Sequence, residues 1–491
     1  MIPEKNEKYN TPKKQEPAIE EETNAKDSEE RAPPRFDRLT AIDFGRGFGL
    51  FIVVVTHIAN YWAFPQLPSE PLGASDGGSM LLLILLFPFQ LLGSWASSFA
   101  LLTGASAAYI MYYQIVEKGR SPRKRILQSI LSAVILLAIH FLYTYLVVYP
   151  TYNITELSQQ GLIPGSLKGE GIQAPDWEFL FIAGPLSMIA FSNLAVSLVC
   201  GFFFSWKKDH EANVNIYLGV LSILGLIFVL GADPIQDLLI PHLYAQFEAG
   251  NYVIAMILTW LVGTKHCIFP FVGYGFFGGM FGLLWIRREP MREKIRKVKR
   301  VGYSFATFFL AIAVGDAILH GIPDLVGLYH PFFLYTLNLS LQLYIATFCL
   351  LFFDVIPEEE RCEYARYRRI IIFRRLSVLS LSVFFIEQTT AALFTGLFLW
   401  IAPALLESFI FILVIFVPLY TYLFLMMVNR WEKFNFKYGM EWFLVCLVKG
   451  KKVTSDEDLL GVQRFIYKSS GYCSADEYFA AKQERKAQKN S

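Results

Sequence analysis

Long apolar runs that recur along the chain constrain its fold more than any other feature. A run of about 18 or more residues is long enough, as a helix, to cross the hydrocarbon core of a bilayer, which is about 30 Å thick. A soluble fold has no use for many such runs, and 54% of the 491 residues are hydrophobic whereas 18% are charged. We therefore predict an all-α, polytopic membrane bundle of about ten transmembrane helices. The predicted spans are 40–62, 88–115, 127–149, 178–205, 214–232, 267–286, 302–321, 332–353, 376–399 and 405–428.

Basic residues are distributed unevenly between the predicted loops. The segments that follow the second, fourth, sixth and eighth spans are rich in Lys and Arg, for example RREPMREKIRKVKR at 287–300. Because basic loops stay on the cytoplasmic side of a cell membrane, both termini are predicted to be cytoplasmic. The segments on the other side, which contain neither Lys nor Arg, are 63–87, 233–251, 322–331 and 400–404.

Outside the spans the chain is polar. Residues 1–36 are charged and poor in aliphatic side chains, so they cannot bury enough apolar surface to fold alone. We predict three parts: a disordered cytoplasmic tail (1–36), a transmembrane domain (37–450) and a polar cytoplasmic C-terminal tail (451–491). Two short apolar segments of the domain, 80–87 and 252–264, are predicted to be outer-surface or re-entrant helices.

Several classes of site are not indicated. The six cysteines show no C-x-x-C spacing, so neither a disulfide framework nor a zinc site is expected. The chain has no G-x-x-x-x-G-K-[ST] motif, which argues against ATP-driven pumping by this chain alone. The net charge of +2 gives no sign of nucleic-acid binding, and none is expected.

The first span, AIDFGRGFGLFIVVVTHIANYW, carries three ionisable side chains that are costly in hydrocarbon. Asp43 and Arg46 are three residues apart on one helix face, so they are close enough to pair. His57 falls on nearly the same face, about 16 Å deeper. The glycines around Arg46 have no side chain, so a neighbouring helix or a ligand can approach the backbone closely at this point. Two interpretations stay open: an interfacial salt bridge with a satisfied interhelical histidine, or a functional site.

The same residues resemble a known signature. RLTAIDFGRGFGLFIVVVTHI is similar to the R-x-x-x-x-D-x-x-R-G-(x)n-H pattern of the transmembrane acyltransferase superfamily, which includes the acyltransferase type three proteins and heparan-alpha-glucosaminide N-acetyltransferase. The segments 86–109, 184–199 and 267–284 resemble later spans of that superfamily. FNFKYGMEWFLVCLVKG at 434–450 resembles the F-x-x-G-P-x-E-W tail of related uncharacterised bacterial membrane proteins, with Met440 in place of Pro. The signature positions are filled by Arg38, Asp43, Arg46, Gly47 and His57.

This resemblance implies a membrane-embedded enzyme. An acyl group, usually acetyl, would pass from acyl-CoA to a hydroxyl or amine of a glycan or lipid-linked acceptor on the outer side. The role of catalytic base or acyl carrier would fall on His57, because histidine is a side chain that can both take up and return a proton in catalysis. The bilayer, acyl-CoA and the acceptor would be its partners, no metal is implied, and a homodimer is left open.

The phosphates of coenzyme A need fixed cations, and Arg suits bidentate phosphate contacts. Arg46 lies on the face of His57, and Asp43 would orient its guanidinium. RSPRKR at 120–125 supplies Arg120 and Arg123, which resemble an R-x-x-R found after an early span of the acyltransferase type three group. The alternative for this second cluster is charge that only sets topology, as in every other basic loop.

Other polar groups lie within predicted spans. Glu387, in VFFIEQTTAALF, is predicted to contact the acceptor or to orient His57. His140, Asp316 and His320 are further candidates to line a cavity. A second function is kept open: a transporter or lipid flippase with the same bundle and no acyl transfer, in which charges within spans are also expected. The remaining polar residues, Asn193, Asn338 and Gln342, are predicted to make interhelical hydrogen bonds.

Overall fold

A computed structural model gives the fold of the chain. The residues that it places are almost all helical, which confirms the predicted all-α class. The two short strands β1 (Thr151–Tyr152) and β2 (Ser158–Gln159) pair antiparallel. The predicted tail 1–36, Arg38 and the expected helix at 80–87 lie outside the described residues. The described residues are 39–63, 94–148, 151–152, 158–159, 161–163, 180, 182–206, 210–263, 266–286, 289–321, 332–356, 365–449, 459–467, 477, 480, 483–484 and 487–488.

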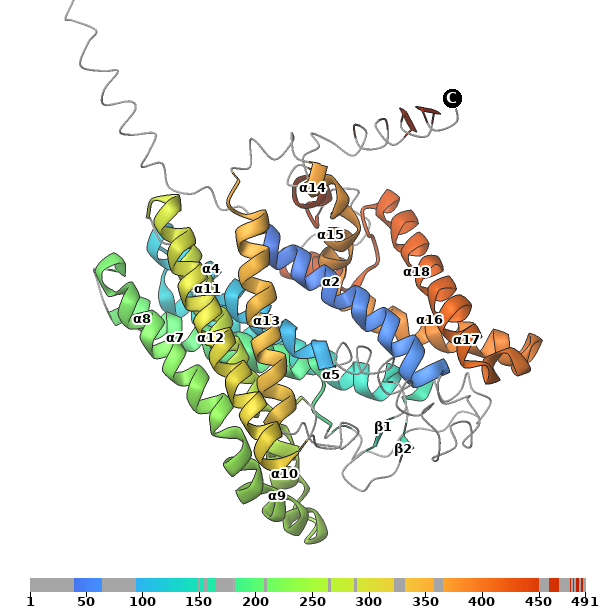
Figure 1. The fold of residues 1–491 in the computed structure, drawn as a ribbon, viewed down its shortest axis with the longest axis horizontal. Helices are drawn as coiled ribbons and strands as arrows, with labels where there is room; N and C mark the ends of the chain where they lie inside the picture. The colour runs from blue at the N-terminus through green and yellow to red at the C-terminus, as the bar shows by residue number, and fades with distance from the viewer. Residues whose placement is uncertain are drawn as a thin grey trace, which may run out of the picture. The chain divides into compact units, whose positions relative to one another are not determined.

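Ten helices within the described part of the chain are long and apolar enough to cross a membrane, which agrees with the predicted number of spans (Figure 1). Two of them begin before the predicted boundary because a proline starts each one: Pro122 occupies the first turn and Pro290 precedes the other. Basic residues near 123–125 and 291–300 therefore lie in helices rather than in loops. The ten are α2 (Thr40–His57), α4 with η4 (Ser98–Glu117), α5 (Pro122–Val147), α7 (Pro185–Trp206), α8 (His210–Leu230), α11 (Ile268–Ile286), α12 (Met291–His320), α13 (Phe332–Phe353), α16 (Ser380–Ile401), and α17 to η10 (Phe409–Phe434, including α18 at Val417–Trp431).

Shorter helices connect or extend these spans. The predicted short helix at 252–264 is confirmed as α10 with the π-helical turn η6. The segment 233–251, which we expected to connect two spans as a loop, instead forms α9 over most of its length. The shorter elements are η1 (Ile58–Ala63), η3 (Ser94–Ser97), α9 (Ala232–Glu248), α10 (Tyr252–Leu258), η6 (Thr259–Gly263), α14 (Ala365–Arg369), α15 (Ile371–Val378), η8 (Pro403–Glu407), α19 (Met440–Lys449) and η11 (Gln463–Tyr467).

Helix α11 is the most deeply buried span and packs against α4, α7 and α8. Its contact with α4 depends on glycine, because a Cβ on Gly104 would lie 1.9 Å from the carbonyl oxygen of Gly275. Small residues of this kind let membrane helices approach until their backbones touch. The α4–α11 pair is therefore packed backbone to backbone, and α7 contacts both of its helices.

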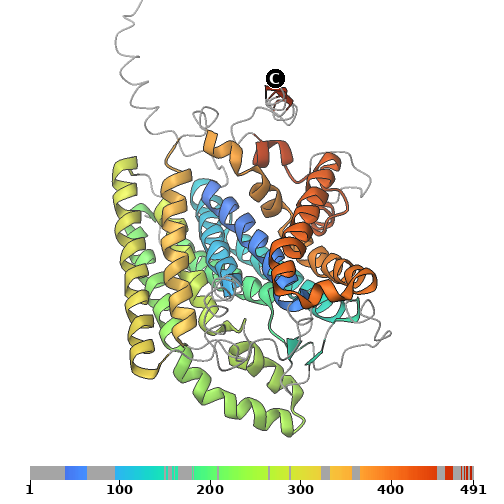
Figure 2. The same ribbon diagram turned by 45° about the vertical axis from the view of Figure 1, so that its right-hand side comes forward.

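Helix α2 lies between α13 on one side and α16 and α18 on the other (Figures 1 and 2). The carboxylate of Asp354, at the end of α13, accepts hydrogen bonds from the first backbone N–H groups of α2, those of Thr40 and Ala41, each at 2.8 Å. A Cβ on Gly47 would lie 1.7 Å from the carbonyl oxygen of Phe373 on α15. The prediction that glycine admits a close neighbour at this point is confirmed.

Two arginines of α15, Arg374 and Arg375, are buried, although the sequence places both in the basic segment that follows the eighth predicted span. Arg375 pairs with Glu432 at 2.7 Å, and Arg374 donates to the backbone oxygen of Phe465 at 2.8 Å. Burial disfavours the charge of Arg375, but Glu432 outweighs this effect and raises the pKa of the guanidinium above its usual value. The Arg374 bond attaches the segment 463–467 to α15, and both arginines have a structural role.

The segment that resembles an F-x-x-G-P-x-E-W tail caps α16. Its turn holds Asn435, Phe436 and Tyr438 at positive φ. The Glu441 carboxylate accepts hydrogen bonds from the backbone N–H groups of Leu381 and Ser382, the second at 3.1 Å. It also accepts one from the Ser382 hydroxyl. The motif therefore satisfies backbone donors at the start of α16 that the helix itself leaves unpaired.

We expect Glu441→Ala to destabilise the protein by about 0.5–2 kcal/mol, the usual cost of losing a helix cap. The loss is measured as a lower Tm of the detergent-solubilised protein. Glu407→Ala, which removes an exposed carboxylate after the other end of α16, is the matched control and should leave Tm unchanged. Equal Tm values for the two variants would contradict the assigned capping role.

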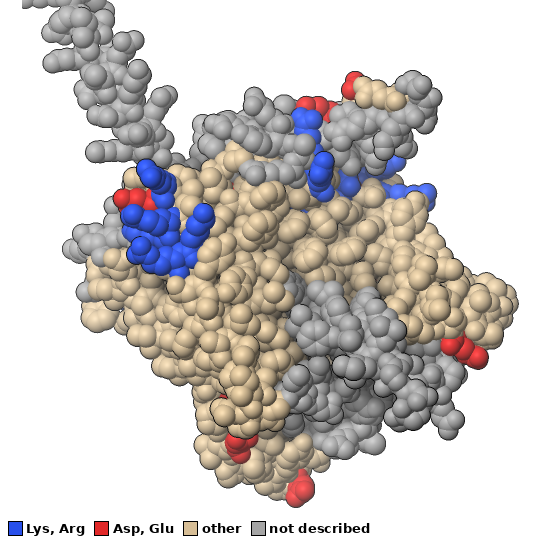
Figure 3. Space-filling view, in the orientation of Figure 1, with Lys and Arg blue, Asp and Glu red and all other residues tan. Residues whose placement is uncertain are grey.

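Basic residues are gathered at one end of the described part of the molecule. On the face in Figure 3, Lys and Arg lie at the upper end, over the start of α12 and beside α14 and α15. Asp and Glu lie on that face at the lower end, over α9, at the right of the view, and also at the upper end beside the basic residues. The asymmetry expected from the loops is thus also found on the folded surface.

Candidate functional site

The imidazole of His57 contacts a buried carboxylate from another span. Its Nδ1 lies 2.7 Å from Oε1 of Glu387 on α16. The Glu387 side chain is fully buried, whereas the His57 side chain is 14% exposed. A carboxylate at this distance fixes the orientation of the ring. Glu387 was predicted to contact the acceptor or to orient His57, and the structure brings the two side chains together.

Gln388 and two aromatic residues surround this pair. Nε2 of Gln388 lies 2.7 Å from Nδ1 of His57 and donates to Oε1 of Glu387 at 2.6 Å. The α-helix ends at His57 and continues as the π-helical turn η1, from which Trp62 donates to Oε1 of Gln388 at 3.3 Å. Tyr420 of α18 donates to the backbone oxygen of Glu387 at 2.8 Å. These contacts hold the carboxylate and the imidazole in one arrangement.

A cavity of about 560 Å³ opens between α2, α4, α5, α7 and α16. Arg46 of α2 and Arg125 of α5 both line it, and Arg46 donates to the Ser106 hydroxyl at 3.4 Å. Two cations and many neutral polar groups in one cavity suit an anionic, highly polar ligand. The hydroxyl and amide side chains of its wall are Thr103, Ser106, Gln128, Ser129, Ser132, Asn193, Ser197 and Ser380.

The cavity and the His57 cluster are joined through α16. Phe384 lines the cavity, and Glu387 lies three residues further along the same helix. Phe99 of α4 also lines the cavity and packs edge-to-face against Phe384, with ring centroids 5.7 Å apart. A buried aromatic pair therefore forms part of the wall near the turn that carries Glu387.

Among the predicted phosphate-binding residues, Arg46 lines the cavity and Arg120 and Arg123 do not. Both of these are exposed, one before α5 and one in its first turn. The cavity is lined instead by Arg125, two residues further on. Asp43 is buried and accepts a hydrogen bond from the Ser377 hydroxyl of α15 at 3.4 Å.

The other polar candidates lie away from this cavity. His140, expected to line it, instead contacts the backbone oxygen of Ile182 through Nε2 at 2.9 Å. Asp316 and His320 pair with each other at 2.9 Å at the end of α12, where the His320 side chain is 73% exposed. The prediction of an interhelical hydrogen bond is confirmed for Gln342, which donates to the Ser97 hydroxyl at 2.6 Å.

Arg125 was not among the residues predicted to bind phosphate, and Asn193 was predicted only to make an interhelical hydrogen bond, but both line the cavity. A signal for Arg125 was present, because Arg125, Gln128, Ser129 and Ser132 recur at the spacing of one helix face. Moving the expected start of the helix from 127 to Pro122 would have placed this polar face in the span.

No group of three or more His, Cys, Asp or Glu within the described ranges is placed to hold a metal ion. The ionisable side chains described above for the cluster and the cavity are an imidazole, a carboxylate and two guanidinium groups. No known family model and no curated protein matches the chain.

Proposed function

We propose that this chain is an acyl-CoA-dependent acyltransferase of the cell membrane, with both termini in the cytoplasm. It would transfer an acyl group, usually acetyl, to a hydroxyl or amine of a glycan or lipid-linked acceptor on the outer side. The observation that carries the proposal is the 2.7 Å contact between His57 and the buried Glu387, next to a cavity lined by two arginines. The gathering of basic residues at one end supports the orientation.

In the proposed reaction His57 is the general base. Its Nε2, on the side of the ring away from Glu387, takes a proton from the acceptor hydroxyl or amine as that group attacks the thioester carbonyl. The carbon–sulfur bond then breaks, and the imidazolium returns the proton to the thiolate of coenzyme A. Glu387 stabilises the imidazolium between the two proton transfers.

The cavity supports the donor part of the proposal. Arg46 and Arg125 would hold the phosphates of acyl-CoA, and the cavity volume of about 560 Å³ falls within the range of about 300–1,000 Å³ that is common for ligand sites.

Oε2 of Glu387 is buried and has no hydrogen-bond partner among the described residues. It would accept a hydrogen bond from a second donor group of the acceptor.

The direct test uses purified full-length protein, radiolabelled acetyl-CoA, and a membrane-lipid and glycan extract. We expect label to move into the extract with release of one free thiol for each acetyl group transferred. A transporter or lipid flippase would show no dependence on coenzyme A. The proposal fails if the protein neither binds acetyl-CoA nor transfers the label.

Arg125→Gln is expected to raise the KM for acetyl-CoA by about 10- to 100-fold, because it removes a charge-assisted contact to phosphate. Arg123→Gln is the matched control, since this side chain carries the same charge in the same turn but is exposed and does not line the cavity. Steady-state kinetics on both variants make the comparison. If KM rises more in Arg123→Gln than in Arg125→Gln, the phosphates bind the exposed pair Arg120 and Arg123 and not Arg125.

A further inference from the structure

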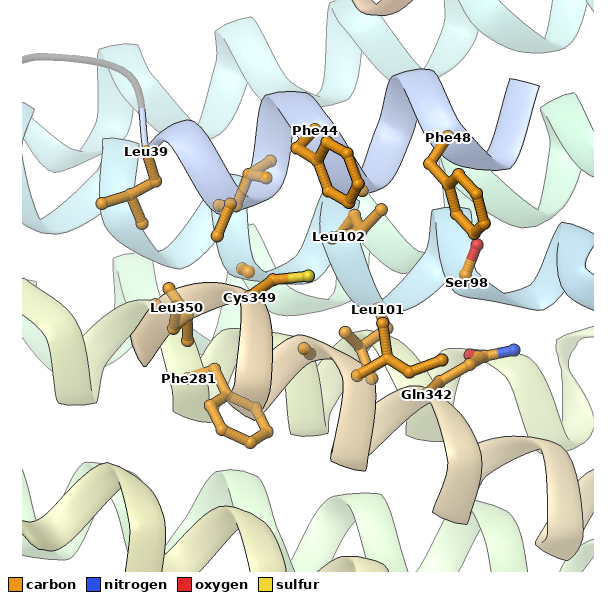
Figure 4. A pocket seen from close by; sticks show the side chains of 17 residues that line it. Leu39, Phe44, Phe48, Ser98, Leu101, Leu102, Phe281, Gln342, Cys349 and Leu350 are labelled. Carbon is orange, nitrogen blue, oxygen red and sulfur yellow. The ribbon is translucent and has the colours of Figure 1, made fainter. Parts of the chain in front are cut away.

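A second pocket lies between α2, α4, α11 and α13 (Figure 4). It is narrow, with a volume of about 50 Å³, and none of the residues that line it is charged. On α4 it is lined by Leu101 and Leu102, whereas the arginine cavity is lined by Thr103 and Ser106, which lie on another face of that helix. The pocket is therefore separate from the site assigned to acyl transfer, and its ligand does not depend on that assignment.

Two buried polar atoms line this apolar pocket. The side chains of Ser98 and Gln342 are 4% and 2% exposed. Oγ of Ser98 and Oε1 of Gln342 have no hydrogen-bond partner among the described residues. The amide of Gln342 is fixed because its Nε2 donates to Ser97. Figure 4 shows Ser98 and Gln342 at one end of the pocket, with Leu39 and Leu350 at the other.

The chemistry of these two atoms defines the missing partner. Oε1 of Gln342 can only accept a hydrogen bond, so the partner must be a donor, and the Ser98 hydroxyl can donate to the same group in return. A hydroxyl meets both needs. A charged headgroup does not, because it would be buried without a counter-ion. The apolar remainder of the wall requires that the hydroxyl be attached to a hydrocarbon body.

The size of the pocket narrows the choice of hydrocarbon. A volume of about 50 Å³ holds only about four water-sized groups at about 10–15 Å³ each. This is room for the last atoms of one unbranched chain and not for fused rings. The partly exposed lining residues Phe44, Phe48 and Ile345 lie on α2 and α13, so the rest of a chain would leave between these helices into the bilayer. We propose that the pocket binds the hydroxyl end of an uncharged single-chain lipid, such as a long-chain alcohol.

The test is photocrosslinking of the purified full-length protein with a dodecanol that carries a diazirine near its hydroxyl. A probe of equal length with a methyl group in place of the hydroxyl is the comparison. We expect the hydroxyl probe to label peptides of α2 and α13 about five- to tenfold more efficiently, the effect of about one hydrogen bond. Equal labelling by the two probes, or no labelling of these peptides, would overturn the proposal.

Variants then locate the contact. Gln342→Leu should reduce labelling by the hydroxyl probe to the level of the methyl probe. Asn338→Leu is the matched control: Asn338 lies one turn away on α13 and is equally buried with an unpartnered oxygen, but it does not line the pocket. Equal losses of labelling in the two variants would count against the assigned site.

A competition experiment on the unaltered protein keeps the proposal testable if Gln342→Leu does not fold. Unlabelled dodecanol should displace the hydroxyl probe, whereas dodecane and dodecyltrimethylammonium should not. Displacement by dodecane as effective as that by dodecanol would show that the pocket takes any alkyl chain. Displacement by the ammonium compound would show that charge is tolerated there, and either result would refute the proposed specificity.

Discussion

His57→Ala is expected to lower kcat for transfer from acetyl-CoA by about 10²–10⁴-fold, the usual contribution of a positioned general base. The KM for acetyl-CoA should change little, because the donor phosphates are assigned to Arg46 and Arg125, which lie in the cavity. Release of free coenzyme A from the purified variant, followed with a thiol reagent, measures the effect.

The matched control for this variant is His320→Ala. His320 also contacts a carboxylate, at 2.9 Å, but it is exposed at the end of α12. The His320→Ala variant should keep the kcat of the unaltered protein. Glu387→Gln, which keeps the size of the side chain but removes its charge, should lower kcat and leave binding of acetyl-CoA intact. An unchanged kcat in His57→Ala would exclude the imidazole as the base.

Gly47→Val is expected to abolish folding of the membrane domain. The new Cβ would lie 1.7 Å from the carbonyl oxygen of Phe373, so α2 and α15 would have to separate. Overpacking commonly costs about 1–3 kcal/mol, and a backbone obstacle that cannot rotate away makes the cost larger. The readout is the yield of monodisperse protein in size-exclusion chromatography after solubilisation.

Gly219→Val tests whether the effect comes from the contact rather than from valine in a helix. Gly219 lies in α8, and a Cβ there would meet no atom within 4 Å. We expect this variant to retain most of the normal yield. A normal yield from Gly47→Val would mean that α2 and α15 are not packed backbone to backbone.

The number of spans could be predicted from sequence because the bilayer imposes the same length and polarity on every span. The pairing of His57 with Glu387 could also be predicted, because an ionisable group in a span needs a partner and few ionisable residues lie within the other spans. Their contact is observed at 2.7 Å, whereas the catalytic roles stay predictions.

Three features were not predicted from the sequence: the lining of the cavity by Arg125, the burial of Arg375 and the capping of α16. They depend on where a helix starts or on contacts between residues distant in sequence. Arg120 and Arg123 were chosen because they resemble an R-x-x-R pattern. Placing the start of the third span five residues late left Arg125 outside the span. Burial of Arg375 depends on Glu432, which lies 57 residues away, and no local pattern reveals that contact. The tail motif was recognised by resemblance, but its capping of α16 required the folded geometry.

The attachment of residues 463–467 to α15 has a consequence for the order of synthesis. These residues leave the ribosome after all ten candidate spans, yet they supply the backbone oxygen that Arg374 binds and the hydroxyl of Tyr467 that lies 3.3 Å from Arg375. Before residues 463–467 are made, Arg374 and Arg375 lack these two contacts. Both arginines lie on α15, the helix that packs on α2 at Gly47. The full set of contacts of α15 is thereby linked to synthesis of residues 463–467, and a chain that stops before Phe465 would lack the backbone oxygen to which Arg374 donates.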